Sequence, residues 1–128
     1  MSKRILGAAA LVFAANAPAF AVSQIWNITE VTESVGGPEG QWHVTIDAEN
    51  RISGSANMQT ASGAVVTYTL GGSINGPEVT VEMSERTDGK KGCVANGRST
   101  LNDDQKSHRV VAQVNCESGG KFYIRGGY

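Results

Sequence analysis

Cysteine, aromatic residues and long apolar runs are all scarce in this sequence. It contains only two cysteines and two tryptophans in 128 residues. No C-x-x-C, H-x-H or H-E-x-x-H spacing occurs, so we expect no metal site and no cofactor. No run of like charge is longer than a pair, and the formal net charge is −1. Nucleic acid and anionic membrane surfaces are therefore poor candidate partners.

The longest apolar stretch lies at the N-terminus. The positively charged start Met1–Arg4 precedes the uncharged, alanine-rich run Ile5–Ala17, and Ala19–Ala21 has the small-x-small pattern that signal peptidase recognises. The run is shorter than the ~20 residues that a membrane-spanning helix needs. We therefore expect residues 1–21 to be a cleaved signal peptide. The mature chain, residues 22–128, is then a single domain without a transmembrane segment, located in the periplasm or secreted.

The two cysteines, Cys93 and Cys116, belong to a chain that we expect to be exported. Disulfides form by default in oxidising compartments, so a Cys93–Cys116 bridge is predicted. By the chain-entropy model such a bridge would contribute about 3 to 4 kcal/mol to the stability of a small domain.

Apolar and polar residues alternate along most of the mature chain, and the helical i, i+3, i+4 pattern is almost absent. Alternation between turn clusters rich in Gly, Asn, Asp and Pro is typical of antiparallel β-sheet. Eight strands are predicted, over residues 24–32, 41–48, 51–58, 66–72, 79–83, 93–99, 108–116 and 122–124.

The number and regular spacing of the predicted strands favour an all-β fold: a small antiparallel up-and-down β-barrel of about eight strands with one disulfide. A β-sandwich is the alternative. Gly54 and Gly72 fall at inward positions of their strands. A tightly curved sheet needs inward positions without a side chain where its strands bend, so these glycines favour the barrel.

Three aromatic residues, Trp42, Tyr68 and Phe122, fall on the inward side of their predicted strands. An eight-stranded barrel can fill its interior with such rings or leave room for one small ligand. An open interior would make these rings, with Arg125 stacked near the barrel mouth, a candidate site for a small apolar ligand. A filled interior would leave the loops Gly36–Gly40 and Gln59–Ala64 as the working surface.

His108 is the main candidate for catalysis, because Ser107 precedes it and Asp103 and Asp104 are close in sequence. No G-x-S-x-G motif surrounds Ser107, and neighbouring side chains of a strand point to opposite faces. We therefore assign no catalytic residue, and a small hydrolase around His108 stays a minor alternative. Asn102 with the two aspartates could contact calcium, but this composition is ordinary for a turn.

The segment Gly40–Trp42, followed by Ile46 and by Asn50–Ser55, resembles the opening hairpin of the calycin barrels, the avidins and lipocalins. In those families a G-x-W at the start of a strand closes one end of the barrel. A late arginine packs over that tryptophan. The resemblance implies a similar barrel here, with Trp42 and Arg125 as the matching pair.

Small periplasmic inhibitors of metalloproteases and of C-type lysozyme are similar in architecture, being compact β-barrels with one disulfide. The lysozyme inhibitors insert a Ser-Gly loop into the cleft of their target, and Ser62-Gly63 resembles that pair. We expect an exported, non-catalytic binding module, either for a small apolar ligand or for another exported protein. A protease or lysozyme inhibitor is the narrower alternative, and an envelope structural component is a third.

Overall fold

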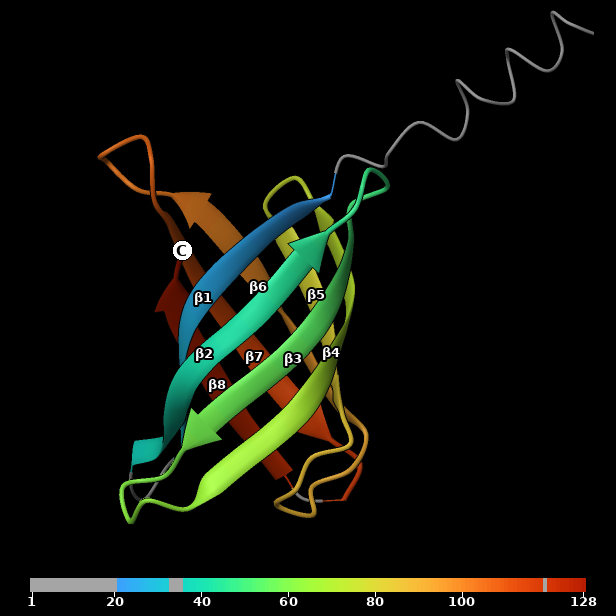
Figure 1. The fold of residues 1–128 in the computed structure, drawn as a ribbon, viewed down its shortest axis with the longest axis vertical. Helices are drawn as coiled ribbons and strands as arrows, with labels where there is room; N and C mark the ends of the chain where they lie inside the picture. Colours follow the sequence, from blue (N-terminus) through green and yellow to red (C-terminus); the bar gives the residue numbers. More distant parts are fainter. Residues whose placement is uncertain (1–20, 33–35, 119) are drawn as a thin grey trace, which may run out of the picture.

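The computed structural model describes residues 21–32, 36–118 and 120–128. They form eight antiparallel strands, each paired with the next in sequence, and β1 pairs with β8 to close the barrel (Figure 1). The strands are β1 (Val22–Val31), β2 (Gly36–Ile46), β3 (Arg51–Gln59), β4 (Val65–Asn75), β5 (Glu78–Ser84), β6 (Cys93–Leu101), β7 (His108–Cys116) and β8 (Gly120–Gly127). The predicted up-and-down barrel is confirmed and the sandwich alternative is wrong.

The predicted signal peptide lies outside the described residues, apart from Ala21. In the part of the chain that is described, no helix is long and apolar enough to span a membrane.

The predicted alternation decides which side chains are buried. Inward positions on every strand form one apolar core, which includes Trp26, Ile28, Trp42, Val44, Met58, Tyr68, Leu70, Val81, Met83, Val110, Val114, Phe122 and Ile124. Most strand ends differ from the prediction by up to three residues. The second strand, however, begins at Gly36 and not at Gln41, so the predicted loop Gly36–Gly40 is wrong: these residues pair with β1 and β3 as part of β2. The second strand ends at Ile46, two residues early, because the Asp47 carboxylate accepts hydrogen bonds from the N–H groups of Glu49 and Arg51. This Asx-type turn reverses the chain.

Gly54 and Gly72 lie where the backbone of a neighbouring strand leaves no room for a side chain, as the prediction of a curved sheet requires. Both have positive φ, 149° and 158°. A Cβ atom at Gly54 would overlap the carbonyl oxygen of His43, and one at Gly72 would overlap that of Thr80. The sheet can therefore close at this curvature only without a side chain at these positions.

The predicted disulfide is confirmed. Cys93 at the start of β6 and Cys116 at the end of β7 are bonded, with an S–S distance of 2.07 Å. These neighbouring strands also pair along their length, so the bridge ties the two where the loops begin.

The barrel has two ends, which we name after one residue each. The Tyr128 end carries the turns after β2, β4 and β6 and the C-terminal residue Tyr128, at the top of Figure 1. The Arg86 end carries the loops after β3, β5 and β7. The loop after β5, residues 85–92, closes the barrel at the Arg86 end.

Candidate functional site

The three aromatic residues predicted to line a ligand site are packed core residues. Trp42 is 0% exposed, Tyr68 3% and Phe122 4%. The Trp42 Nε1–H donates a hydrogen bond of 2.9 Å to the Tyr68 hydroxyl, and the two rings meet edge to face. Trp26 stacks between Trp42 and Tyr128, with ring centroids 5.9 and 4.5 Å away. Offset stacking and edge contacts of this kind stabilise a filled interior.

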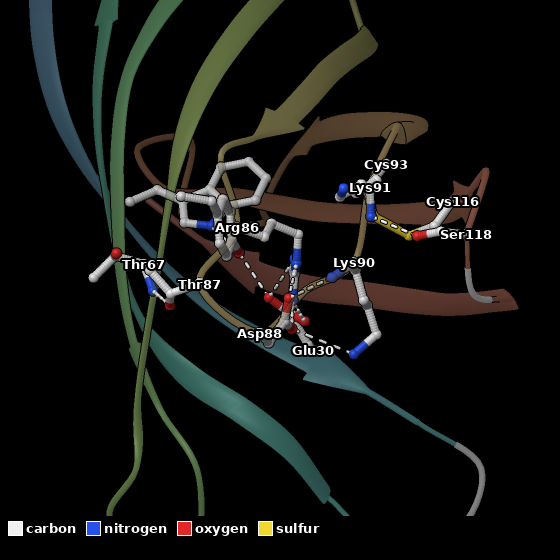
Figure 2. A network of polar contacts seen from close by, with 12 residues as sticks. Glu30, Thr67, Arg86, Thr87, Asp88, Lys90, Lys91, Cys93, Cys116 and Ser118 are labelled. Atoms are coloured by element: carbon white, nitrogen blue, oxygen red, sulfur yellow. Dashed lines mark hydrogen bonds and ion pairs between the residues drawn. A yellow bond between two sulfur atoms is a disulfide. The ribbon is translucent and has the colours of Figure 1, made fainter.

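A buried ion pair closes the Arg86 end, and it was not predicted from the sequence. Arg86, from the loop 85–92, donates to both carboxylate oxygens of Glu30 on β1, at 3.2 and 2.9 Å (Figure 2). The Tyr68 hydroxyl donates to the same carboxylate at 2.8 Å. The guanidinium carbon also lies 4.5 Å from the centroid of the Tyr68 ring and 5.4 Å from that of Phe122. Arg86 thus joins the aromatic core to β1.

Glu85 explains why Arg86 points inward. Met83 is buried and Ser84 exposed, so continued alternation would place Arg86 outside the barrel. Glu85 instead has φ of 56°, in the left-handed region, which turns its own side chain to solvent and that of Arg86 to the core. A loop conformation therefore positions the guanidinium.

Asp88 completes the hydrogen bonding of Arg86, accepting from Nε at 3.0 Å and from Nη2 at 2.6 Å. Burial lowers the pKa of Arg86, but hydrogen bonds to Asp88 and Glu30 outweigh that effect and raise the pKa above its usual value. Burial, together with the charge of Glu30, raises the pKa of the Tyr68 hydroxyl. Both groups therefore keep their protons at any ordinary pH.

Two further contacts fix the loop 85–92 to the barrel wall. Thr87 and Thr67 of β4 are joined by two hydrogen bonds, from the N–H of Thr87 to the Thr67 carbonyl and from the N–H of Thr67 to the Thr87 hydroxyl. The N–H of Lys91 donates to the Ser118 hydroxyl at 2.8 Å, beside the disulfide (Figure 2). The loop is thus anchored to β1, β4 and the turn after β7.

The predicted packing of Arg125 over Trp42 is wrong. Arg125 is exposed on the outer face of β8, opposite Val111 of β7 and Thr29 of β1. Phe122 and Ile124 occupy the inward positions of β8, so residue 125 must point outward. Arg86 is the arginine that packs on the core rings, and it comes from a loop.

Glu30 could have been noticed in the sequence. It continues the inward series Trp26, Ile28, Glu30, and a carboxylate at a buried position requires a buried partner. The identity of that partner could not be read in the same way, because the path of the loop 85–92 places it.

Around His108 the contacts that the minor hydrolase alternative would need are not assembled. The Ser107 hydroxyl donates to Asp104 at 2.7 Å and accepts from the Asn102 amide at 2.9 Å. The ring of His108 stacks on Tyr128 with centroids 4.7 Å apart, and no hydrogen bond joins it to Ser107 in the described residues. Nothing in this geometry activates the Ser107 oxygen as a nucleophile.

Asn102, Asp103 and Asp104 form a turn. The Asp104 carboxylate accepts hydrogen bonds from the N–H groups of Lys106 and Ser107, and these bonds lower its pKa. Over residues 21–32, 36–118 and 120–128, no cluster of three His, Cys, Asp or Glu side chains could hold a metal ion.

Two grooves open on the outer surface and share Asn27 and Thr29 of β1. The first groove, of about 630 Å³, lies over β1 and β2 and reaches the loop after β3; its lining includes Gly37, Glu39, Gly40, Gln41, Gln59, Thr60 and Ala61. The second groove, of about 670 Å³, lies over β1, β8 and β7; its lining includes Asn102, Ser107, His108, Arg109, Arg125, Gly126 and Gly127. The first groove thus contains residues of both segments predicted as a working surface, of which Gly36–Gly40 belongs to strand β2 and only Gln59–Ala64 forms a loop.

The predicted loop contacts, Ser62 and Gly63, are exposed at the tip of the loop beside the first groove. The loop is well hydrogen bonded: Thr60 bonds to Ala64 through both its backbone N–H and its hydroxyl, which also contacts the Ser62 hydroxyl at 3.0 Å. Gly63 has φ of 92°. A left-handed glycine and these bonds fix the shape of the tip.

Comparison with known protein families, with curated proteins and with solved structures finds no match for this chain.

Proposed function

We propose that this protein is an exported, non-catalytic binding module that engages another exported protein through its outer surface. The observation that carries the proposal is the contrast between the barrel's interior and its exterior. Trp42, Tyr68 and Phe122 fill the interior, and Arg86 with Glu30 closes one end. Both grooves, in contrast, open on the outer face around β1.

The lining of the first groove suits a polypeptide. Amide and hydroxyl groups of Asn27, Thr29, Gln41 and Thr60 can donate to or accept from the backbone of a partner loop. Glu39 is the one ionisable side chain in that lining. A rigid wall with adaptable polar groups favours recognition of a preformed loop, since little conformational entropy is lost on either side.

A small apolar ligand inside the barrel is less well supported. A relationship to the calycins that goes further than the barrel architecture has equally little support. The rings that would contact such a ligand already contact one another and Arg86. Native mass spectrometry distinguishes the two cases. A small mass that leaves only on denaturation of the purified mature protein would favour the interior ligand and count against our proposal.

The inhibitor alternative is a narrower form of the same function. The exposed Ser62-Gly63 tip is rigid enough to enter the cleft of an enzyme without losing much entropy. Inhibition of a C-type lysozyme or a secreted metalloprotease that is lost on Ser62→Arg substitution would establish it. The same substitution should change the melting temperature little, because the Ser62 side chain is exposed and its hydrogen bond to the Thr60 hydroxyl is exposed as well.

The proposal is tested by site-specific photo-crosslinking in the envelope of the source cell. A photoreactive amino acid is placed at Thr29, Gln41 or Ala61 in the first groove, and at Ser53, Ser73 or Thr80 as exposed controls on other strands. We expect one discrete crosslinked protein from the groove positions that the control positions do not give. Equal crosslinking at both sets, or none at any groove position, would overturn the proposal.

A further inference from the structure

The outer face of β6, β7 and β8 carries positive charge without any negative charge. Its cationic side chains are Arg98 on β6, Arg109 on β7, and Lys121 and Arg125 on β8, and all four are exposed. Every other outward position of these three strands is neutral: Val94, Asn96, Thr100, Val111, Gln113, Asn115, Tyr123 and Gly127. We call this surface the basic face. Composition alone does not account for it, because the whole chain has a formal net charge of −1.

The arginines of the basic face have no partner within the described chain. Five arginines are described, and the two outside this face are ion-paired. Arg51 pairs with Asp47 and Glu49. Arg86 pairs with Glu30 and Asp88. Arg98, Arg109 and Arg125 make no ion pair and no side-chain hydrogen bond to any described residue.

The free arginines surround two exposed apolar side chains. Strand register places Val111 between Arg98 and Arg125, with Arg109 two residues away on the same strand. Tyr123 lies between Lys121 and Arg125 along β8. Val111 is 41% exposed and Tyr123 55%. Side chains at such cross-strand and i±2 positions are within about 5 to 7 Å of one another, so cations and apolar groups form one surface.

This combination resembles the composition of protein–protein contact surfaces. Tyrosine and arginine are enriched at the centre of such surfaces, and carboxylates are depleted there. The second groove adjoins the basic face, since Arg109 and Arg125 line it. Carboxylates lie at the border of this face: the exposed Glu117 directly follows β7, and on the next strand Glu78 of β5 lies opposite Arg98. The rim on that side would repel an acidic partner and so limit where it docks.

We propose that the basic face docks an acidic surface of a partner protein, with carboxylates around an apolar or aromatic side chain that packs on Val111 and Tyr123. The inference rests on the proposed binding function and names the chemistry of the partner. The geometry favours a protein over an anionic polysaccharide, because two exposed apolar side chains lie among the cations and sulfate-rich chains offer them no apolar counterpart.

The test uses the purified mature protein and a fluorescent random copolymer of glutamate and tyrosine, followed by anisotropy. Replacing Arg98, Arg109 and Arg125 together by glutamine should weaken binding roughly tenfold and flatten its salt dependence. The control triple, Arg51→Gln, Lys91→Gln and Lys106→Gln, makes the same change in net charge at exposed positions elsewhere. It should stay within about twofold of the wild type. Tyr123→Ser should remove the preference for the copolymer over polyglutamate.

Equal losses in the two triple variants would overturn the inference, since binding would then follow net charge alone. Tighter binding of heparin than of the copolymer, with loss in the basic-face triple only, would overturn it in favour of a polysaccharide.

The failure of this inference can be distinguished from the failure of the proposed function. A partner crosslinked at the β1 groove that still binds the basic-face triple would overturn this inference and leave the proposed function standing. If no groove position gives a crosslink but copolymer binding depends on the basic face, the proposed function would be overturned and the basic face would still be an acidic-ligand surface.

Discussion

Arg86 and Glu30 are joined through two parallel hydrogen bonds inside the barrel, although 56 residues separate them in the sequence. Both side chains are almost completely buried, at 0% and 1% exposed. A bidentate pair of this kind is geometrically specific, and each charge depends on the other to offset the loss of water. The pair connects the loop 85–92 to the first strand and thereby closes the Arg86 end.

Glu30→Gln should destabilise the protein by about 3 kcal/mol, because Arg86 would stay buried without its main counter-charge. The free energy of unfolding in urea measures this loss. Replacing both Glu30 and Arg86 by methionine should cost less than the single change, since neither buried charge then remains. The control Glu82→Gln, on an exposed position of β5, should change stability by less than about 0.5 kcal/mol. Additive losses in the double variant would contradict the ion-pair interpretation.

Acid should destabilise the protein through Asp88. Partial burial raises its pKa, but hydrogen bonds from Arg86 and from the Lys90 N–H outweigh burial and lower the pKa from 3.8 to about 2. Because the folded pKa is depressed, the stabilisation is fully present above pH 3.8 and is lost as the pH falls towards about 2. In urea titrations at successive pH values, Asp88→Asn should reduce the acid-induced loss of the free energy of unfolding. Asp103→Asn, at an exposed loop position, should retain it; an equal reduction in both variants would contradict the assignment.

Removing the disulfide should lower stability by about 3 kcal/mol, as expected for a closed loop of this length. The variant carries Cys93→Ala with Cys116→Ala, and thermal or urea unfolding measures the difference. Hydrogen exchange should quicken most at Lys91 and Ser118, which are hydrogen bonded next to the bridge. Reduced wild-type protein is the matched control. Unchanged stability in both samples would show that strand pairing alone determines the ends of β6 and β7.

The close approach of β4 and β5 predicts a contrast between two adjacent glycines. Gly72→Ala should cost about 3 kcal/mol, because its methyl group would overlap the Thr80 carbonyl and its φ is positive. Gly71→Ala should change stability by less than about 0.5 kcal/mol, since its methyl group would enter open space. Similar unfolding midpoints for the two variants would refute the argument that curvature requires Gly72.

The sequence by itself determined the architecture of this protein. Period-two alternation is a local property, and it decides which face of each strand is apolar. Burial of those faces, with short turns between successive strands, leads to an up-and-down sheet. Gly54 and Gly72 mark where that sheet bends. The pairing of Cys93 and Cys116 followed from there being two cysteines in a chain with an export signal pattern.

Only the tertiary structure decided how the barrel end is closed and where the charges gather. Arg86 lies in a loop, and a single left-handed residue, Glu85, turns it inward, whereas alternation turns Arg125 outward. The basic face depends on the register between β6, β7 and β8, which brings Arg98 and Arg125 to either side of Val111. Loop paths and cross-strand neighbours follow from packing over the whole domain, and local sequence patterns do not contain that information.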